Sequence, residues 1–103
     1  MECLTFNYPA KTPLPECSHV GVVGSGDLEI IMVPNDQKVI NVEVNTSIDG
    51  FADIWKVVLE RFFKANHYAM NVKINDFGAT PGMVTMRLAQ ALEVSNTHEY
   101  AQR

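Results

Sequence analysis

The chain has 103 residues, of which 47% are hydrophobic and 19% are charged. This length and balance fit one globular domain with a single core. The formal net charge is −4, and the lysines and arginines are scattered, which argues against nucleic-acid binding. We find no apolar run of 18 residues and no secretion signal, so we expect a cytoplasmic protein that does not cross a membrane.

The first half of the chain has the pattern of strands. Alternating or β-rich apolar runs predict four strands, over residues 2–8, 19–23, 27–33 and 38–46. The segment 9–16 holds three prolines and is expected to be a loop.

A helical period of 3.6 residues then begins. The apolar positions form one stripe: Phe51, Ile54, Trp55, Val58, Leu59, Phe62 and Phe63. This stripe predicts a helix that faces the core, and Ser47 or Asp49 could cap its start.

The last third predicts a strand, a second helix and a tail. Residues 70–75 alternate as a strand. Thr80 and Pro81 are a suitable helix start, because threonine can cap and proline lacks only an orphan N–H there. The buried stripe of this helix is Val84, Leu88, Ala91 and Leu92. We expect the polar residues 95–103 to be a frayed C-terminal tail.

The predicted order is β-β-β-β-α-β-α, within a single domain over residues 1–94. The fold class is therefore α+β, with a mixed or antiparallel sheet of four to five strands. Two helices packed on one face would bury that sheet most simply.

A serine between two glycines is the most informative local feature. Gly24, Ser25, Gly26 and Asp27 lie between two predicted strands. The glycines remove side-chain bulk around the hydroxyl, so an enzyme that modifies Ser25 could reach it. The alternative is a tight turn with a solvated serine. Asp27 and Glu29 could guide a basic partner toward the serine, or Asp27 could simply brace the turn by bonding backbone N–H groups.

Other chemistries fit the residues less well. A hydrolase elbow needs glycines two positions on either side of the serine, where this chain has Val23 and Asp27. Cys3, Cys17 and His19 lack the paired spacing of a metal site, so we expect no metal and two reduced, buried or half-buried thiols.

The sequence also resembles the acyl carrier (delta) subunit of bacterial malonate decarboxylase. The likeness covers nearly the whole chain outside the proline loop and the tail. It rests on two segments above all, Gly24-Ser25-Gly26-Asp27-Leu28-Glu29 and Asp76-Phe77-Gly78-Ala79-Thr80-Pro81-Gly82. The acyl carrier subunit of citrate lyase is a more distant likeness.

The resemblance implies that Ser25 is esterified with 2'-(5''-phosphoribosyl)-3'-dephospho-CoA through a phosphodiester, within the segment formed by Gly24, Gly26 and Asp27. The thiol at the end of this arm would carry acetyl or malonyl as a thioester. The implied partners are an acyl-carrier transferase subunit, decarboxylase subunits and the transferase that attaches the prosthetic group. The chain itself would be a non-catalytic carrier rather than an enzyme.

Two other functions stay open at this point. The chain could be a non-covalent adaptor subunit of a decarboxylase or citrate-lyase-like assembly, with Ser25 as a turn residue. It could also be a small independent enzyme, which turnover by the isolated chain would reveal.

Overall fold

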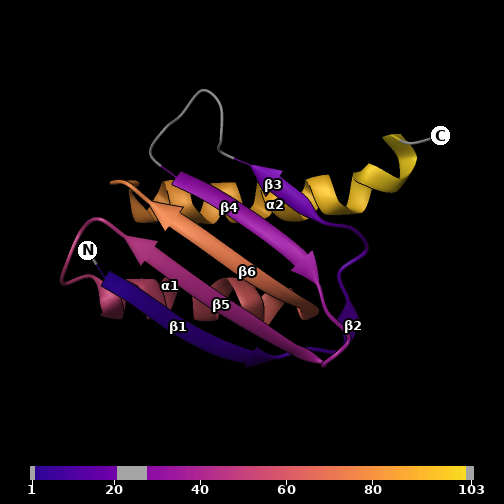
Figure 1. The fold of residues 1–103 in the computed structure, drawn as a ribbon, viewed down its shortest axis with the longest axis horizontal. Coiled ribbons are helices and arrows are strands. Elements are labelled where there is room, and N and C mark those ends of the chain that lie inside the picture. Colours follow the sequence, from indigo (N-terminus) through magenta and orange to yellow (C-terminus); the bar gives the residue numbers. More distant parts are fainter. Residues whose placement is uncertain (1, 21–27, 102–103) are drawn as a thin grey trace.

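A mixed sheet with both helices against one of its faces forms the body of the molecule (Figure 1). The computed structural model describes residues 2–20 and 28–101. The strands are β1 (Glu2–Pro9), β2 (Thr12–Pro13), β3 (Ser18–Val20), β4 (Leu28–Pro34), β5 (Val39–Thr46) and β6 (Tyr68–Asp76). The helices are α1 (Ala52–Ala65) and α2 (Pro81–Ala101). The predicted α+β class is confirmed.

The strand order is β1-β5-β6-β4-β3, so strands that are distant in sequence lie side by side. The β5 and β6 strands are parallel and are joined through α1, because a parallel pair needs a crossover connection. All other neighbours in this order pair antiparallel. The short β2 strand pairs in parallel with the start of β6.

The core lies between the sheet and the helices. Alternate strand residues face it, as the period-two pattern predicts: Leu28, Ile30, Met32, Ile40, Val42, Val44, Met70, Val72 and Ile74. The helices contribute Trp55, Leu59, Phe62, Phe63, Val84, Leu88 and Ala91. At the edge of the sheet, the rings of Tyr8 and Phe63 stack with centroids 5.7 Å apart, which joins β1 to α1.

The start of α1 differs from the sequence prediction. Phe51 occupies the N-cap position and no side-chain hydrogen bond caps this helix, so the predicted cap by Ser47 or Asp49 was wrong. Phe51 and Ile54 are 43% and 42% exposed, whereas the stripe predicted both in the core. The predicted stripe is buried from Trp55 onward, at Trp55, Leu59, Phe62 and Phe63.

The proline-rich segment is more ordered than the expected loop. Its β2 strand pairs with Tyr68 and Ala69, and the N–H of Leu14 donates to the Ala69 carbonyl oxygen at 3.1 Å. Leu14 is buried in the main core. This segment therefore covers the beginning of β6.

The second helix continues beyond Val94, where the predicted domain ends. The α2 helix runs to Ala101, in place of the frayed backbone that polarity suggested. Ser95 is buried at the point where the tail was predicted to begin. Its hydroxyl exchanges two hydrogen bonds with the backbone of Glu16, which attaches α2 to the segment between β2 and β3.

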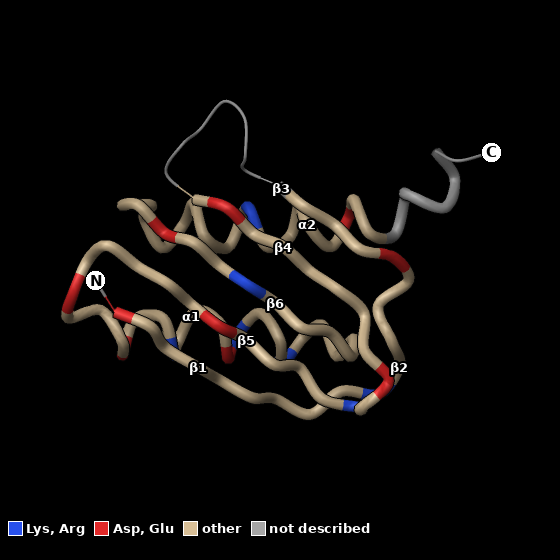
Figure 2. Tube along the Cα trace, in the orientation of Figure 1, with Lys and Arg blue, Asp and Glu red and all other residues tan. Residues whose placement is uncertain are grey.

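Charged positions are interspersed along the described strands and helices (Figure 2). In the part of the chain that the structure describes, neither helix is long and apolar enough to cross a membrane.

Candidate functional site

The four residues predicted to carry the prosthetic group, Gly24, Ser25, Gly26 and Asp27, lie outside the described residues. The strands on either side of them are described. The β3 and β4 strands pair antiparallel, with Val20 opposite Ile30. Residues 21–27 thus join two strands of one hairpin.

The strands β4, β6 and β5 lie side by side at the end of the sheet where β4 begins. Leu28 pairs with Asp76, and Asp76 pairs with Thr46 on the other side. Neighbouring strands lie about 4.8 Å apart. The β5 and β6 strands end here, and each continues through a short connection into a helix, β5 into α1 and β6 into α2 (Figure 1). The connection that contains Ser25 therefore enters the sheet beside the starts of both helices.

The buried carboxylate of Asp76 accepts hydrogen bonds from three groups at this end of the sheet. Its Oδ1 accepts from the backbone N–H groups of Gly78 at 3.1 Å and Ala79 at 2.9 Å. Its Oδ2 accepts from the Thr46 hydroxyl at 2.8 Å. Gly78 has a φ of 120°, a conformation that favours glycine. Thr80 then caps α2 by accepting from the N–H of Met83 at 3.2 Å, as predicted.

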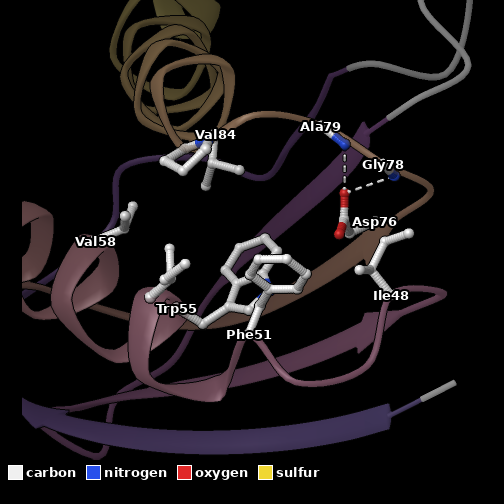
Figure 3. Close-up of a pocket in the computed structure, with 10 residues that line it drawn as sticks. Ile48, Phe51, Trp55, Val58, Asp76, Gly78, Ala79 and Val84 are labelled. Atoms are coloured by element: carbon white, nitrogen blue, oxygen red, sulfur yellow. Dashed lines mark hydrogen bonds between the residues drawn. The ribbon is translucent and has the colours of Figure 1, made fainter.

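A hollow of about 380 Å³ lies between the starts of α1 and α2 and the β6–α2 connection. We call it the helix-start hollow. Figure 3 shows the side chains of Phe51, Trp55, Val84 and Ile48 pointing into this space, with Asp76 at its side. Among the described lining residues, Asp76 has the one charged side chain. Since its oxygens already accept three hydrogen bonds, the lining presents mainly apolar surface.

A row of polar side chains crosses the opposite, open face of the sheet. Glu29 accepts from Asn75 at 2.7 Å and contacts the ring nitrogen Nε2 of His19 at 2.7 Å. Asn75 in turn accepts from Asn45 at 3.3 Å. The hydrogen bonds from Asn75 and then from His19 hold the pKa of the Glu29 carboxyl below its usual range. Both carboxylate oxygens of Glu29 therefore contact side chains of neighbouring strands, Asn75 on β6 and His19 on β3.

The two cysteines are exposed, free thiols. The prediction that they are buried or half-buried was wrong, because Cys3 lies on the open face of β1 and Cys17 lies between β2 and β3. Among the described residues, no group of three or more His, Cys, Asp or Glu side chains could hold a metal ion.

Sequence reasoning did not find the helix-start hollow. It identified residues 76–82 as the connection between strand and helix, and this is confirmed. Phe51 and Ile54 gave no separate signal, since their spacing fits the core stripe. Their place in the lining depends on contacts between α1, the β6–α2 connection and α2, which are distant in sequence.

Comparisons with known proteins agree with one another. A family model described as malonate decarboxylase delta subunit (MdcD) matches residues 16–95. A malonate decarboxylase acyl carrier protein from Azotobacter vinelandii (strain DJ) is 50% identical over 98 residues, covering 93% of this chain and 99% of that protein. One from Pseudomonas putida (strain W619) is 44% identical over 94 residues, covering 90% and 95%.

A solved structure has the same fold. It is a chain in the crystal structure of a Pseudomonas malonate decarboxylase hetero-tetramer in complex with malonate. The TM-score is 0.84 at 42% sequence identity, and the match covers 92% of this chain and 99% of that chain. The chain therefore belongs to the malonate decarboxylase delta subunit family, whose curated relatives are acyl carrier proteins.

Proposed function

We propose that the chain is the non-catalytic acyl carrier subunit of a malonate decarboxylase and that Ser25 holds its prosthetic group. The observation that carries this proposal is the family match over residues 16–95, which includes Ser25 and its neighbours. The proposed group is phosphoribosyl-dephospho-coenzyme A, joined to the Ser25 hydroxyl as a phosphodiester. When bound, this group supplies a terminal thiol on which acetyl and malonyl are exchanged as thioesters.

The residues of this chain fit such a group. A serine hydroxyl can form a phosphate ester, and Gly24 and Gly26 leave room around it. The antiparallel pairing of β3 with β4 holds both ends of the Ser25 connection. The buried Asp76 hydrogen bonds fix the neighbouring connection at the same edge of the sheet. The chain thus offers a modifiable hydroxyl attached to a rigid body.

Tethering accounts for the carrier role. A thioester held on the chain reaches each partner site at a raised effective concentration, provided that the arm spans the distance. The Pseudomonas chain of the same fold is part of a hetero-tetramer. For this chain we propose the corresponding partners, which are an acyl-carrier transferase subunit, decarboxylase subunits and the transferase that attaches the arm.

The test is attachment of the prosthetic group in vitro. Wild type, Ser25→Ala and Ser47→Ala are each incubated with the attaching transferase and its activated donor, and intact masses are measured. Ser47→Ala is the matched control, because Ser47 is an exposed serine in the β5–α1 connection. We expect the added mass on wild type and on Ser47→Ala, and none on Ser25→Ala.

Two results would count against the proposal. Modification of the Ser25→Ala variant would assign the arm to another residue. An unmodified wild type that still co-purifies with the decarboxylase subunits would favour the non-covalent adaptor.

A further inference from the structure

The helix-start hollow has the properties of a small-molecule site. Its volume of about 380 Å³ lies in the range of ligand pockets. Its lining is mostly aliphatic and aromatic, and its mouth includes side chains that are partly exposed, such as Ile48 and Ile54. A concave shape of this kind is better suited to binding a small ligand than to contacting the flat surface of another protein.

The hollow lies beside the point where the connection that contains Ser25 joins β4. Asp76 lines the hollow and pairs directly with Leu28, the first residue after the connection that contains Ser25. Ser25 is three positions before Leu28, and three residues of chain span at most about 11 Å. A group tethered to Ser25 therefore has a raised effective concentration at the hollow, so even weak apolar contacts would fill it.

The lining distinguishes between the two acyl groups. An acetyl end presents a methyl group and methylenes, which apolar side chains accommodate well. A malonyl end adds a carboxylate, whose burial in an apolar site without a cation is unfavourable. The charge already at the wall is the carboxylate of Asp76, which would repel a second anion.

From these observations we propose that the helix-start hollow shelters the acetylated end of the arm and excludes the malonylated end. This inference rests on the proposed function of Ser25. The acetyl thioester is then shielded between turnovers, whereas the malonyl thioester stays outside, where a decarboxylase subunit can reach it.

The test measures cleavage of each thioester by hydroxylamine on the isolated, arm-bearing chain. Peptide mapping first verifies the arm on Ser25. Each rate is divided by that of the same acyl group on free dephospho-coenzyme A. We expect the acetyl thioester of wild type to be cleaved roughly three- to tenfold more slowly than the free thioester, and the malonyl thioester at the same rate as its free counterpart. Emission from Trp55, the single tryptophan, should change on acetylation and not on malonylation.

Three variants locate the effect. Ala79→Leu should fill the hollow and abolish the protection. Ile54→Gln makes its mouth polar and should reduce the protection. Val57→Gln is the matched control, because Val57 is an exposed aliphatic residue of α1 that does not line the hollow, and it should leave the protection intact.

The outcomes separate this inference from the proposed function. If no arm is found on Ser25, both are wrong. If the arm is on Ser25 but the acetyl thioester of wild type is cleaved at the free rate, only the inference is overturned. It is also overturned if Ala79→Leu keeps the protection and instead weakens assembly with a partner subunit, since the hollow is then a protein-docking surface.

Discussion

Ser95 and Glu16, 79 positions apart in the sequence, exchange two hydrogen bonds. The Ser95 hydroxyl donates to the Glu16 carbonyl oxygen at 2.5 Å and accepts from the Glu16 N–H at 3.1 Å. A single buried hydroxyl thus satisfies both backbone groups of a residue outside the sheet. This pair fixes the segment before β3 against α2.

Replacing Ser95 by alanine should therefore destabilise the fold. The change leaves the part-buried N–H and carbonyl group of Glu16 without their partner, and we expect a loss of about 1–3 kcal/mol in the free energy of unfolding. Urea denaturation followed by circular dichroism measures it. The control is Thr85→Ala on the exposed side of the same helix, which should stay within about 0.5 kcal/mol of wild type. Equal midpoints for the two variants would contradict the buried contact.

The hydrogen bonds of Asp76 predict a second large effect. Asp76→Ala removes the acceptor for Thr46 and for the N–H groups of Gly78 and Ala79, so we expect a loss of roughly 3 kcal/mol. Thr46→Val removes one donor to Asp76 and the acceptor of the Ile48 N–H, and should cost less. A double-mutant cycle between the two positions should show a clear coupling energy. Additive effects would mean that the hydrogen bond contributes nothing to stability.

The row on the open face predicts a change in the titration of Glu29. Asn75→Ala should raise the pKa of Glu29 toward its ordinary value, because the Asn75 hydrogen bond is the largest cause of the shift. His19→Ala should raise it less. Carboxyl carbon NMR over pH 2 to 7 measures these values. Asn71→Ala, on the same strand but bonded to Asn35 and Asn41, should leave the Glu29 curve in place.

The same shift predicts how stability depends on pH. A carboxyl whose pKa is lowered by folding stabilises the native state above its ordinary pKa, near 4.5. This contribution is lost as the pH falls through the folded value. The difference in urea midpoint between wild type and Asn75→Ala should therefore be larger at pH 7 than at pH 3. A difference that grows on acidification would contradict the assignment.

The aromatic stripe of α1 should divide into two classes. Phe63 is almost fully buried and contacts both Tyr8 and Phe62, so Phe63→Ala should cost about 3–5 kcal/mol. Phe51 lies at the mouth of the hollow, and Phe51→Ala should cost only about 1 kcal/mol. Thermal denaturation compares the two. Similar losses would show that Phe51 belongs to the core.

Local patterns predicted the elements well, because strand alternation and helix period depend on neighbours in sequence. The burial of Ile40, Val42 and Val44 follows from alternation alone. The pairing of β6 between β5 and β4 does not, since it depends on contacts between distant segments.

The errors have a common cause. Polarity predicted a frayed tail, yet Ser95 is buried because Glu16 satisfies its hydroxyl. Three prolines predicted a loop, yet the segment supplies β2 and the core residue Leu14. In each case a tertiary contact outweighed the local propensity. The role of Ser25 is predicted from its glycine neighbours and from family likeness, and its attachment to an arm stays a prediction.

The central claim is that Ser25 carries the prosthetic group, and the intact mass of the chain tests it most directly. The chain is purified from its native host during growth on malonate, and peptide mapping follows around Ser25. The account predicts an added mass that matches phosphoribosyl-dephospho-coenzyme A, located on the peptide that contains Ser25. An unmodified chain from these cells, or the same added mass on a different peptide, would contradict it.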